Sequence, residues 1–390
     1  MVQTLIEQIK NTIQDGNINL FLGSGLSYPF LSTLGNIELL LTECDSATID
    51  ENQRRIIRAS LYRRYFTEVI EKNRLILKAD PSAVAKLEEY TAFLRSWNSI
   101  LLNRKNTLLS KEINIFTTNI DIFPEMATES LDLQFNDGFN GRFRPRFSLS
   151  NYKQSRFKKG LYFDKTSELP VFNLIKLHGS LSWATAVDIV EFCADLKHIE
   201  KVSAVLPVAG ACIDVPDGAK FADLLTAASG LTPHTSIDGF MSAYEELLIV
   251  VNPTKEKFKH TLLNQTYYEL LRLYSNELEK ENTVLLVFGF SFADEHIREI
   301  TLRAANSNPT LMIYVFAYTA TARAQIEANF GAVNIRNRNV KIVSPEQEAD
   351  AAGVMVDKFS FDFPALNERV VQPLASLCES RQAPGANAFV

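Results

Sequence analysis

The chain of 390 residues has only four cysteines, and they lie far apart. Cys44, Cys193, Cys212 and Cys378 form no CxxC pair. Because zinc ribbons and knuckles take their thiolate ligands from closely spaced cysteines, this spacing argues against such a module, and we expect no structural zinc. Widely separated cysteines are typical of reduced, mostly buried thiols in a cytoplasmic protein.

Long apolar runs and an excess of positive charge are also missing. No run reaches the roughly 18 apolar residues of a membrane span, and the chain does not open with the basic stretch and apolar core of a secretion signal. We therefore expect a cytoplasmic protein without membrane contact. The formal net charge of −6 gives no general attraction to nucleic acid, so we expect no sequence-specific nucleic-acid binding.

Strands and helices alternate along most of the chain. Such an order predicts an α/β fold with a mostly parallel sheet and helices on both faces. Helices are predicted from Asp80-Pro81 onward, from Asn252-Pro253-Thr254 to about Leu278, and at Pro364–Leu377 with a break at Pro373. Apolar runs predict strands at residues 18–22, 113–116, 171–177, 202–208, 247–251, 283–288, 311–316 and 340–343.

The stretch Ile113–Asp121 (INIFTTNID) changes from an apolar strand to a polar turn within a few residues. Ligands of open α/β sheets bind beyond the carboxyl ends of the strands, so Asn119 and Asp121 are candidates for chemistry. The alternative is that Asn and Asp only cap the next helix or shape the turn, which is their usual role.

Glycine or histidine follows three other predicted strands. The strand at 18–22 leads into Gly23-Ser24-Gly25-Leu26-Ser27, whose backbone can approach a pyrophosphate or can form an ordinary turn. The strand at 171–177 leads into His178-Gly179-Ser180, where the glycine is expected to leave room for a ligand beside an imidazole that can accept a proton. A lone histidine here is more often structural. The strand at 283–288 ends in Gly289-Phe290-Ser291.

Two basic segments have ordinary explanations. The helix after Asp50 carries a run of basic residues, which we interpret as a solvated face or, less often, a partner or oligomer surface. These residues are Arg54, Arg55, Arg58, Arg63, Arg64, Lys72 and Arg74. The segment 141–147 (GRFRPRF) alternates arginine with aromatic residues, which suits nucleic acid or a phosphate. We favour an irregular loop or an edge hairpin that packs its aromatic rings inward.

Taken together and in this order, the four strand-end sites resemble the sirtuin superfamily. Its members have a glycine-rich loop ending in Ser, a T-Q-N-[IV]-D turn, a catalytic His-Gly and a late Gly-x-Ser. The resemblance implies a Rossmann-like NAD-binding domain in which Asn119 and Asp121 face the nicotinamide ribose and carboxamide and His178 is the base. It implies further NAD contacts from Gly23, Ser24, Gly25 and Ser27 at the pyrophosphate, Thr118 in the turn, and Gly289 and Ser291 at the adenosine.

The domain boundaries follow from the order of the predicted helices and strands and from a shift in composition at 184–245. The Rossmann-like domain is interrupted by a helical insertion and by a small inserted subdomain or lid, and a C-terminal helix and tail follow it. The ranges are 1–49, 107–183 and 246–345 for the domain, 50–106 for the helical insertion, 184–245 for the subdomain and 346–390 for the helix and tail.

Three features resemble one bacterial group of sirtuin-like proteins that acts in anti-phage defence. They are the GFSFADEHI ending, the NPTKEKF stretch at 252–258 and the helical insertion. Members hydrolyse NAD, and some are encoded beside a HerA-type ATPase. The resemblance implies a gated NAD glycohydrolase with NAD as substrate, a homo-oligomer, and a possible HerA-type ATPase partner.

Several positions depart from the deacylating sirtuins. The two CxxC pairs after the His-Gly are missing, Thr118 stands where deacylases have Gln, and Ser24 replaces Ala. The arginine that follows the glycine loop in deacylases has no match after Pro29. Deacylation is therefore disfavoured. A non-catalytic NAD or ADP-ribose sensor and a nucleic-acid scaffold are the two functions that compete with hydrolysis.

Overall fold

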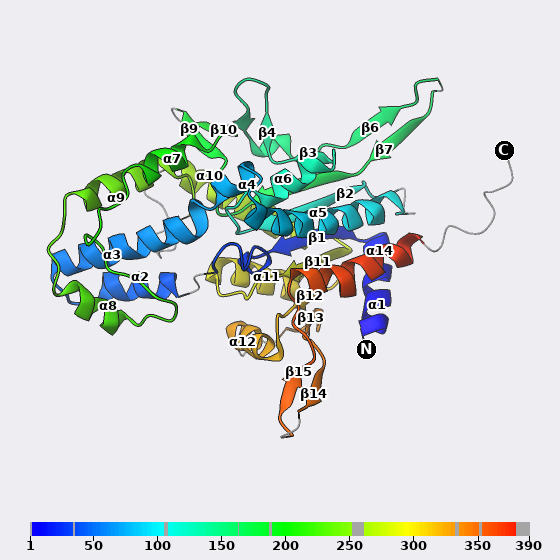
Figure 1. Cartoon of the computed structure of the whole chain (residues 1–390). Helices are drawn as coiled ribbons and strands as arrows, with labels where there is room; N and C mark the ends of the chain where they lie inside the picture. Colours follow the sequence, from blue (N-terminus) through cyan, green and yellow to red (C-terminus); the bar gives the residue numbers. More distant parts are fainter. Residues whose placement is uncertain are drawn as a thin grey trace.

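The computed structural model describes residues 2–33, 36–104, 108–162, 164–186, 189–251, 261–331, 335–350 and 353–379. Within these ranges the centre of the molecule is a seven-stranded sheet whose neighbouring strands are all parallel (Figure 1). This confirms the predicted α/β class and the Rossmann-like parallel sheet. In spatial order the strands are β13 (Val340–Val343), β12 (Met312–Phe316), β11 (Thr283–Phe288), β1 (Asn17–Leu22), β2 (Glu112–Thr117), β8 (Val171–Lys176) and β3 (Gln134–Asn136).

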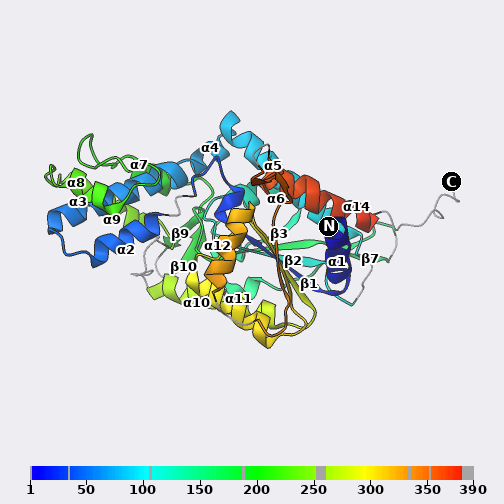
Figure 2. The same ribbon diagram turned by 90° about the horizontal axis from the view of Figure 1, so that it is seen from below.

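Alternate residues of each strand face opposite sides of the sheet, and each side has its own apolar core. In β1, Ile18, Leu20 and Leu22 belong to one core and Phe21 to the other. Helices therefore cover both faces (Figure 2). The first core is covered by α1 (Val2–Asp15), α5 (Pro81–Leu102), α6 (Phe123–Ser130) and α14 (Gln372–Glu379), the second by α10 (Thr261–Glu279), α11 (Glu295–Ser307) and α12 (Ala320–Phe330).

The two insertions pack together into one helical lobe beside the sheet (Figure 1). The aromatic rings of Tyr62 and Phe66 meet those of Phe240 and Tyr244 in T-shaped contacts inside it. The lobe is therefore a joint structure of both insertions. Its helices are α3 (Glu51–Tyr65) from the first insertion, and α7 (Lys197–Ser203), α8 (Phe221–Ala228) and α9 (Ser236–Leu247) from the second. α2 (Ile37–Ser46), which precedes the predicted start of the first insertion, also packs on α3 and α8 in this lobe.

The basic run on α3 pairs with the second insertion. Three of its arginines form ion pairs with the second insertion, whereas Arg54 and Arg58 pair with Glu51 and Asp45, so this run is neither a purely solvated face nor an open partner surface. Such partly exposed pairs contribute little stability each, roughly 0–1 kcal/mol, so they orient the two insertions while the aromatic contacts hold them. The pairs are Arg55–Asp238, Arg63–Asp214 and Arg64–Asp217, with Arg74–Glu200 following from α4 (Asn73–Leu77).

Two predicted strands are wrong. Residues 202–208 include the end of α7, where Val202 is buried in the lobe. Residues 247–251 form only an isolated antiparallel bridge between Val250 and Gly179. The apolar residues of 247–251 are buried or partly buried, whereas in 202–208 Val205 and Val208 are exposed, so the run at 202–208 is apolar without forming a strand.

Two helices predicted in the C-terminal half of the chain, at 252–278 and at 364–377, are each supported by the structure only in part. The start predicted at Asn252-Pro253-Thr254 lies outside the described residues, and α10 ends at Glu279, next to the predicted end. The last helix is not broken at Pro373, because the chain passes from α13 (Phe363–Leu366) through a π-helical turn (Asn367–Val371) directly into α14. None of the helices within the described ranges combines the length and apolar character needed to cross a bilayer.

The segment that follows β3 forms hairpins at the edge of the sheet. Phe139 of β4 (Phe139–Asn140) and Phe147 of β5 (Arg146–Phe147) pack on Trp183 of β9 (Trp183–Ala186), while Phe143 between them is fully exposed. β10 (Ile189–Phe192) completes this small sheet. Phe139 and Phe147 therefore pack inward as predicted, whereas Phe143 at the tip does not.

Removing one ring of the lobe tests whether the lobe is a separate cooperative unit. Phe240→Ala is expected to destabilise it by about 3–5 kcal/mol, because a buried aromatic side chain is lost. Hydrogen exchange should increase in α3 and α9 and stay slow in β1 and β11. Tyr268→Ala, which truncates an exposed ring of α10, is the matched control. Equal acceleration in sheet and lobe would contradict the prediction.

Candidate functional site

The order in which the chain adds strands to the sheet reverses between β1 and β11. From β1 the chain continues to β2 on one side, and from β11 it continues to β12 on the other. Such a switch point is where open α/β sheets place their ligands, beyond the carboxyl ends of the strands. The Gly23–Ser27 loop after β1 and the Gly289–Ser291 loop after β11 lie there side by side.

These two loops are in direct backbone contact. The amide of Gly23 donates to Phe288 O (2.9 Å) and that of Gly25 to Gly289 O (3.0 Å). A Cβ on Gly23 would lie 2.3 Å from the Gly289 carbonyl oxygen, and Gly289 itself has φ +64. The glycines therefore allow close loop contact. The Gly23 and Gly25 amides are used in that contact, whereas Ser24 is exposed beside it.

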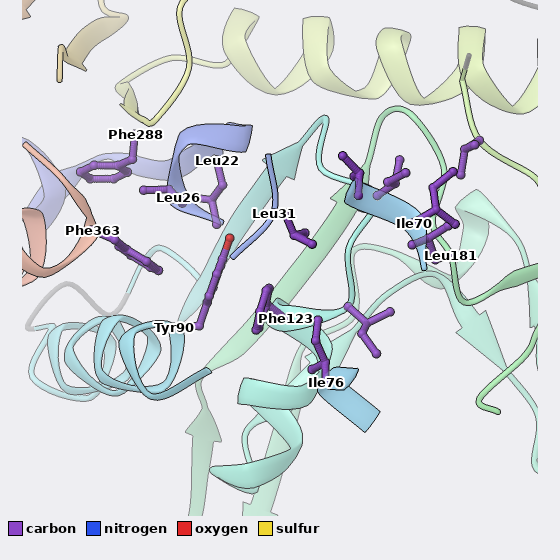
Figure 3. Close-up of a cluster of buried hydrophobic side chains, with 14 of the residues drawn as sticks. Leu22, Leu26, Leu31, Ile70, Ile76, Tyr90, Phe123, Leu181, Phe288 and Phe363 are labelled. Atoms are coloured by element: carbon purple, nitrogen blue, oxygen red, sulfur yellow. The ribbon is translucent and has the colours of Figure 1, made fainter. Parts of the chain in front are cut away.

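Ser27 is the centre of a buried chain of hydroxyl groups. Its Oγ lies 2.7 Å from Asp121 Oδ2, to which it donates, and 2.9 Å from the Tyr90 hydroxyl. A hydroxyl has one proton, so Tyr90 donates to Ser27 while Ser27 donates to Asp121. Tyr90 comes from α5 and stacks on Phe123 (Figure 3). The helical insertion thus supplies a site residue that the sequence did not indicate.

Of the two polar atoms of the Asn119 side-chain amide, the nitrogen makes a hydrogen bond within the described ranges and the oxygen does not. Its Nδ2 donates to Gly23 O (3.1 Å), which identifies the nitrogen because a carbonyl can only accept. Its Oδ1 is buried and, among the described residues, receives no hydrogen bond. Thr117 shapes the turn, since its Oγ1 donates to Leu22 O (2.7 Å) and accepts from the Asn119 amide (2.9 Å). Thr118 beside it is half-buried.

A free buried acceptor is costly. Leaving such a group without a donor costs about 1–3 kcal/mol, and a ligand hydroxyl that donated to Asn119 Oδ1 would recover it. The interpretation of Asn119 as a simple helix cap does not fit, because its side chain bonds to the loop after β1 instead of to the amides of α6. Asp121, by contrast, accepts from the Phe123 amide (3.2 Å) and does act partly as a cap.

Lys176, the last residue of β8, joins two of the strand-end turns. Its buried ammonium donates to the backbone oxygen of Asp121, to Glu125 Oε1 (2.8 Å) and to Ser180 Oγ (3.2 Å). Burial raises the pKa of both Asp121 and Glu125, and the charge of Lys176 opposes that rise. The sequence motifs did not indicate Lys176, although a lysine that ends an otherwise apolar strand is a signal that could have done so.

His178 lies at the end of β8 and reaches the loop after β11. Its Nε2 is 3.2 Å from Asp294 Oδ2, and Asp294 also caps α11 by accepting from the Ile297 amide (3.1 Å). The imidazole is partly exposed and borders a small pocket lined also by Tyr267, Trp183 and Val251. Asp294 was not predicted, because nothing in the sequence relates it to His178.

The space expected beside Gly179 is filled. Gly179 has φ +77, and a Cβ there would lie 2.4 Å from the carbonyl oxygen of Ile249. The glycine is required by the approach of the chain at Val250, and a ligand would have to meet His178 from another side. This corrects the prediction that the glycine leaves room for a ligand.

The predicted residues thus form two groups. Asn119 and Asp121 meet Gly23 and Ser27 in one network, whereas His178 belongs to a second group with Asp294, and Lys176 connects their two turns. Ser291 is exposed, and its carbonyl accepts from Asn329 Nδ2 (2.9 Å). In the described part of the chain no group of three or more His, Cys, Asp or Glu side chains could hold a metal ion.

A methyl group on Gly23 should separate the two loops. Gly23→Ala is expected to reduce the free energy of unfolding by about 1–3 kcal/mol, because the Gly289 carbonyl occupies the space of the new Cβ. Gly230→Ala is the matched control, since a Cβ there meets nothing within 4 Å. Equal thermal denaturation curves for the two variants would contradict the contact.

Asp121 should make stability depend on pH. Its pKa is raised in the folded chain, so its contribution to stability is largest below the unfolded value of about 3.9 and is lost as pH rises through the folded pKa. Asp121→Asn has no ionisable group at this position, so its stability does not fall through this ionisation as pH rises. Urea unfolding from pH 3.5 to 7 should therefore show the free energy of unfolding of the natural chain falling relative to the variant as pH rises. Parallel curves would contradict a raised pKa.

No protein-family model matches the chain, and no curated protein matches it.

Proposed function

We propose that the protein is an NAD glycohydrolase, which cleaves NAD to nicotinamide and ADP-ribose. The observation that supports this most is Asn119, whose amide oxygen is buried and, within the described part of the chain, receives no hydrogen bond, at the switch point of a parallel sheet. A ribose hydroxyl is a suitable donor for it. The proposal also rests on the resemblance of the four strand-end sites to the sirtuin superfamily.

The reaction breaks the bond between the ribose C1′ and the nicotinamide nitrogen through an oxocarbenium-like transition state. Asn119 would hold the ribose hydroxyls through Oδ1 and place a water molecule near C1′. That water forms the new C–O bond as nicotinamide leaves with the bonding electrons. Nicotinamide is neutral after departure, so no strong acid is required. A positioned base contributes about 10²–10⁴-fold to such a step.

His178 is the proposed base, and Asp294 is its proposed positioning partner. The imidazole would take the proton from the attacking water or from a ribose hydroxyl. A carboxylate 3.2 Å from Nε2 would stabilise the charge that the ring then carries, although among the described residues Nε2 makes no hydrogen bond in this conformation. Asp121 accepts from Ser27, and its contact with the nicotinamide carboxamide therefore requires that this hydrogen bond be exchanged.

Burial of the site supports a gated enzyme. Asn119, Asp121 and Ser27 are all buried in this conformation, so NAD can reach them only when the surrounding loops move. A cell would need such control, because free NAD hydrolysis is toxic. We propose a gated effector of anti-phage defence in the cytoplasm, which acts as a homo-oligomer and with a HerA-type ATPase as activating partner.

The test is the release of nicotinamide and ADP-ribose from NAD by the purified chain, with and without the ATPase. Asn119→Ala and His178→Ala should each reduce release by at least about 10²-fold, because they remove the ribose acceptor and the base. Asn11→Ala and His296→Ala, at exposed positions, are matched controls and should keep full activity.

Two outcomes would count against hydrolysis. An active Asn119→Ala/His178→Ala double variant would refute the assignment of the site. NAD binding by calorimetry, weakened by Asn119→Ala but without release under any condition, would favour the second candidate, a non-catalytic NAD or ADP-ribose sensor. The closed, hydrogen-bonded Ser27–Asp121 network is the observation that keeps this candidate open.

A further inference from the structure

A basic hairpin projects from the edge of the sheet (Figure 1). It consists of β6 (Arg156–Lys159) and β7 (Thr166–Leu169), which within the described ranges pair with each other alone. Large apolar side chains on it are exposed to solvent: Phe157 by 64%, Leu161 by 91% and Tyr162 by 87%. A two-stranded hairpin is marginally stable by itself in water, so exposed rings on a projecting one indicate a docking surface.

The charge of this basic hairpin is mostly positive. Its acidic residues are Asp164 and Glu168, and the Glu168 carboxylate already accepts from the Lys111 amide (3.1 Å). A partner for this surface must therefore present apolar groups together with negative charge. The basic residues are Arg156, Lys158, Lys159 and Lys165.

An acidic hairpin projects from the opposite side of the molecule (Figure 1). It consists of β14 (Gln347–Ala349) and β15 (Met355–Asp357), which among the described strands also pair only with each other. Val354, Met355 and Val356 are exposed on it. Its acidic residues, Glu346, Glu348, Asp350 and Asp357, outnumber the single basic residue, Lys358, so its net charge is negative. Glu346 forms an ion pair with Lys358 (3.6 Å), and Asp357 accepts from the Ala320 amide (3.0 Å).

The two hairpins are complementary in the properties that an interface needs. Each exposes apolar side chains, and their charges are opposite. Because they project from opposite sides, one chain cannot join its own two hairpins. We propose that the basic hairpin of one copy of this chain docks on the acidic hairpin of the next copy. The inference does not depend on NAD cleavage.

The geometry of this contact determines the kind of assembly. Two different surfaces meet, so the interface is heterologous and copies join head to tail into a closed ring or an open filament. Duplex nucleic acid would suit the basic hairpin alone, but it would leave the apolar residues of the acidic hairpin uncovered. A second copy covers both surfaces with one interaction.

Charge reversal on each hairpin tests the contact by sedimentation velocity of the full chain. Lys158→Glu/Lys159→Glu and Glu346→Lys/Glu348→Lys should each weaken self-association at least about tenfold, and higher salt should weaken it in the natural chain. An equimolar mixture of the two variants should associate again, because each supplies the partner surface that the other lacks. Lys201→Glu/Lys220→Glu, at exposed sites in the lobe, is the matched control.

Three results would overturn the proposal. The first is a natural chain that stays monomeric at every concentration tested. The second is assembly that neither reversal weakens, or that the mixture fails to restore while circular dichroism shows both variants folded. The third is a monomer that binds a short DNA duplex through the basic hairpin, which would assign this surface to nucleic acid. NAD cleavage is measured separately, so its failure would not change these results.

Discussion

The carbonyl oxygen of Gly289 occupies the space that any side chain on Gly23 would need, and the candidate site depends on this contact. It brings the loops after β1 and β11 together at the switch point, where the strand order of the sheet reverses. The Gly23 carbonyl is then in position to hold the Asn119 amide, and Asn119 turns its oxygen away from that contact. A larger residue at Gly23 would move each of these groups.

A second constraint comes from charge inside the protein. Lys176 is buried at the end of β8, and its ammonium holds the turn of Asp121 and the turn of His178 in one arrangement. Separating a buried charge from its hydrogen-bond partners costs free energy. Lys176 therefore fixes the turn that carries Asn119 relative to the turn that carries His178. The burial that fixes this arrangement would also exclude the proposed substrate NAD, which is why the proposed function includes a gate.

Much of the fold was readable because its signals are local. The runs at 283–288 and 340–343 match β11 and β13 residue for residue. β11 is fully buried inside the parallel sheet and is therefore a short, nearly continuous apolar run, whereas β13 is the partly exposed edge strand and includes Lys341. The same signal failed at 202–208, where the run begins at the end of α7 and continues through the exposed Val205 and Val208, because an apolar run by itself does not show that a segment is buried. The strand-end turns were also found, because polar residues that follow an apolar run stand out in any sequence.

By itself, the sequence determined the parallel α/β sheet and the set of candidate residues after its strands, because both follow from side-chain patterns within a few residues. Only the tertiary structure decided their partners. Tyr90 lies 63 positions from Ser27, and Asp294 more than a hundred from His178, so no local pattern relates them. The structure also decided that Arg55, Arg63 and Arg64 of α3 pair with the second insertion. It decided as well that the space beside Gly179 is filled by the backbone of Ile249. Such contacts depend on how separate elements pack, and packing is a property of the whole chain.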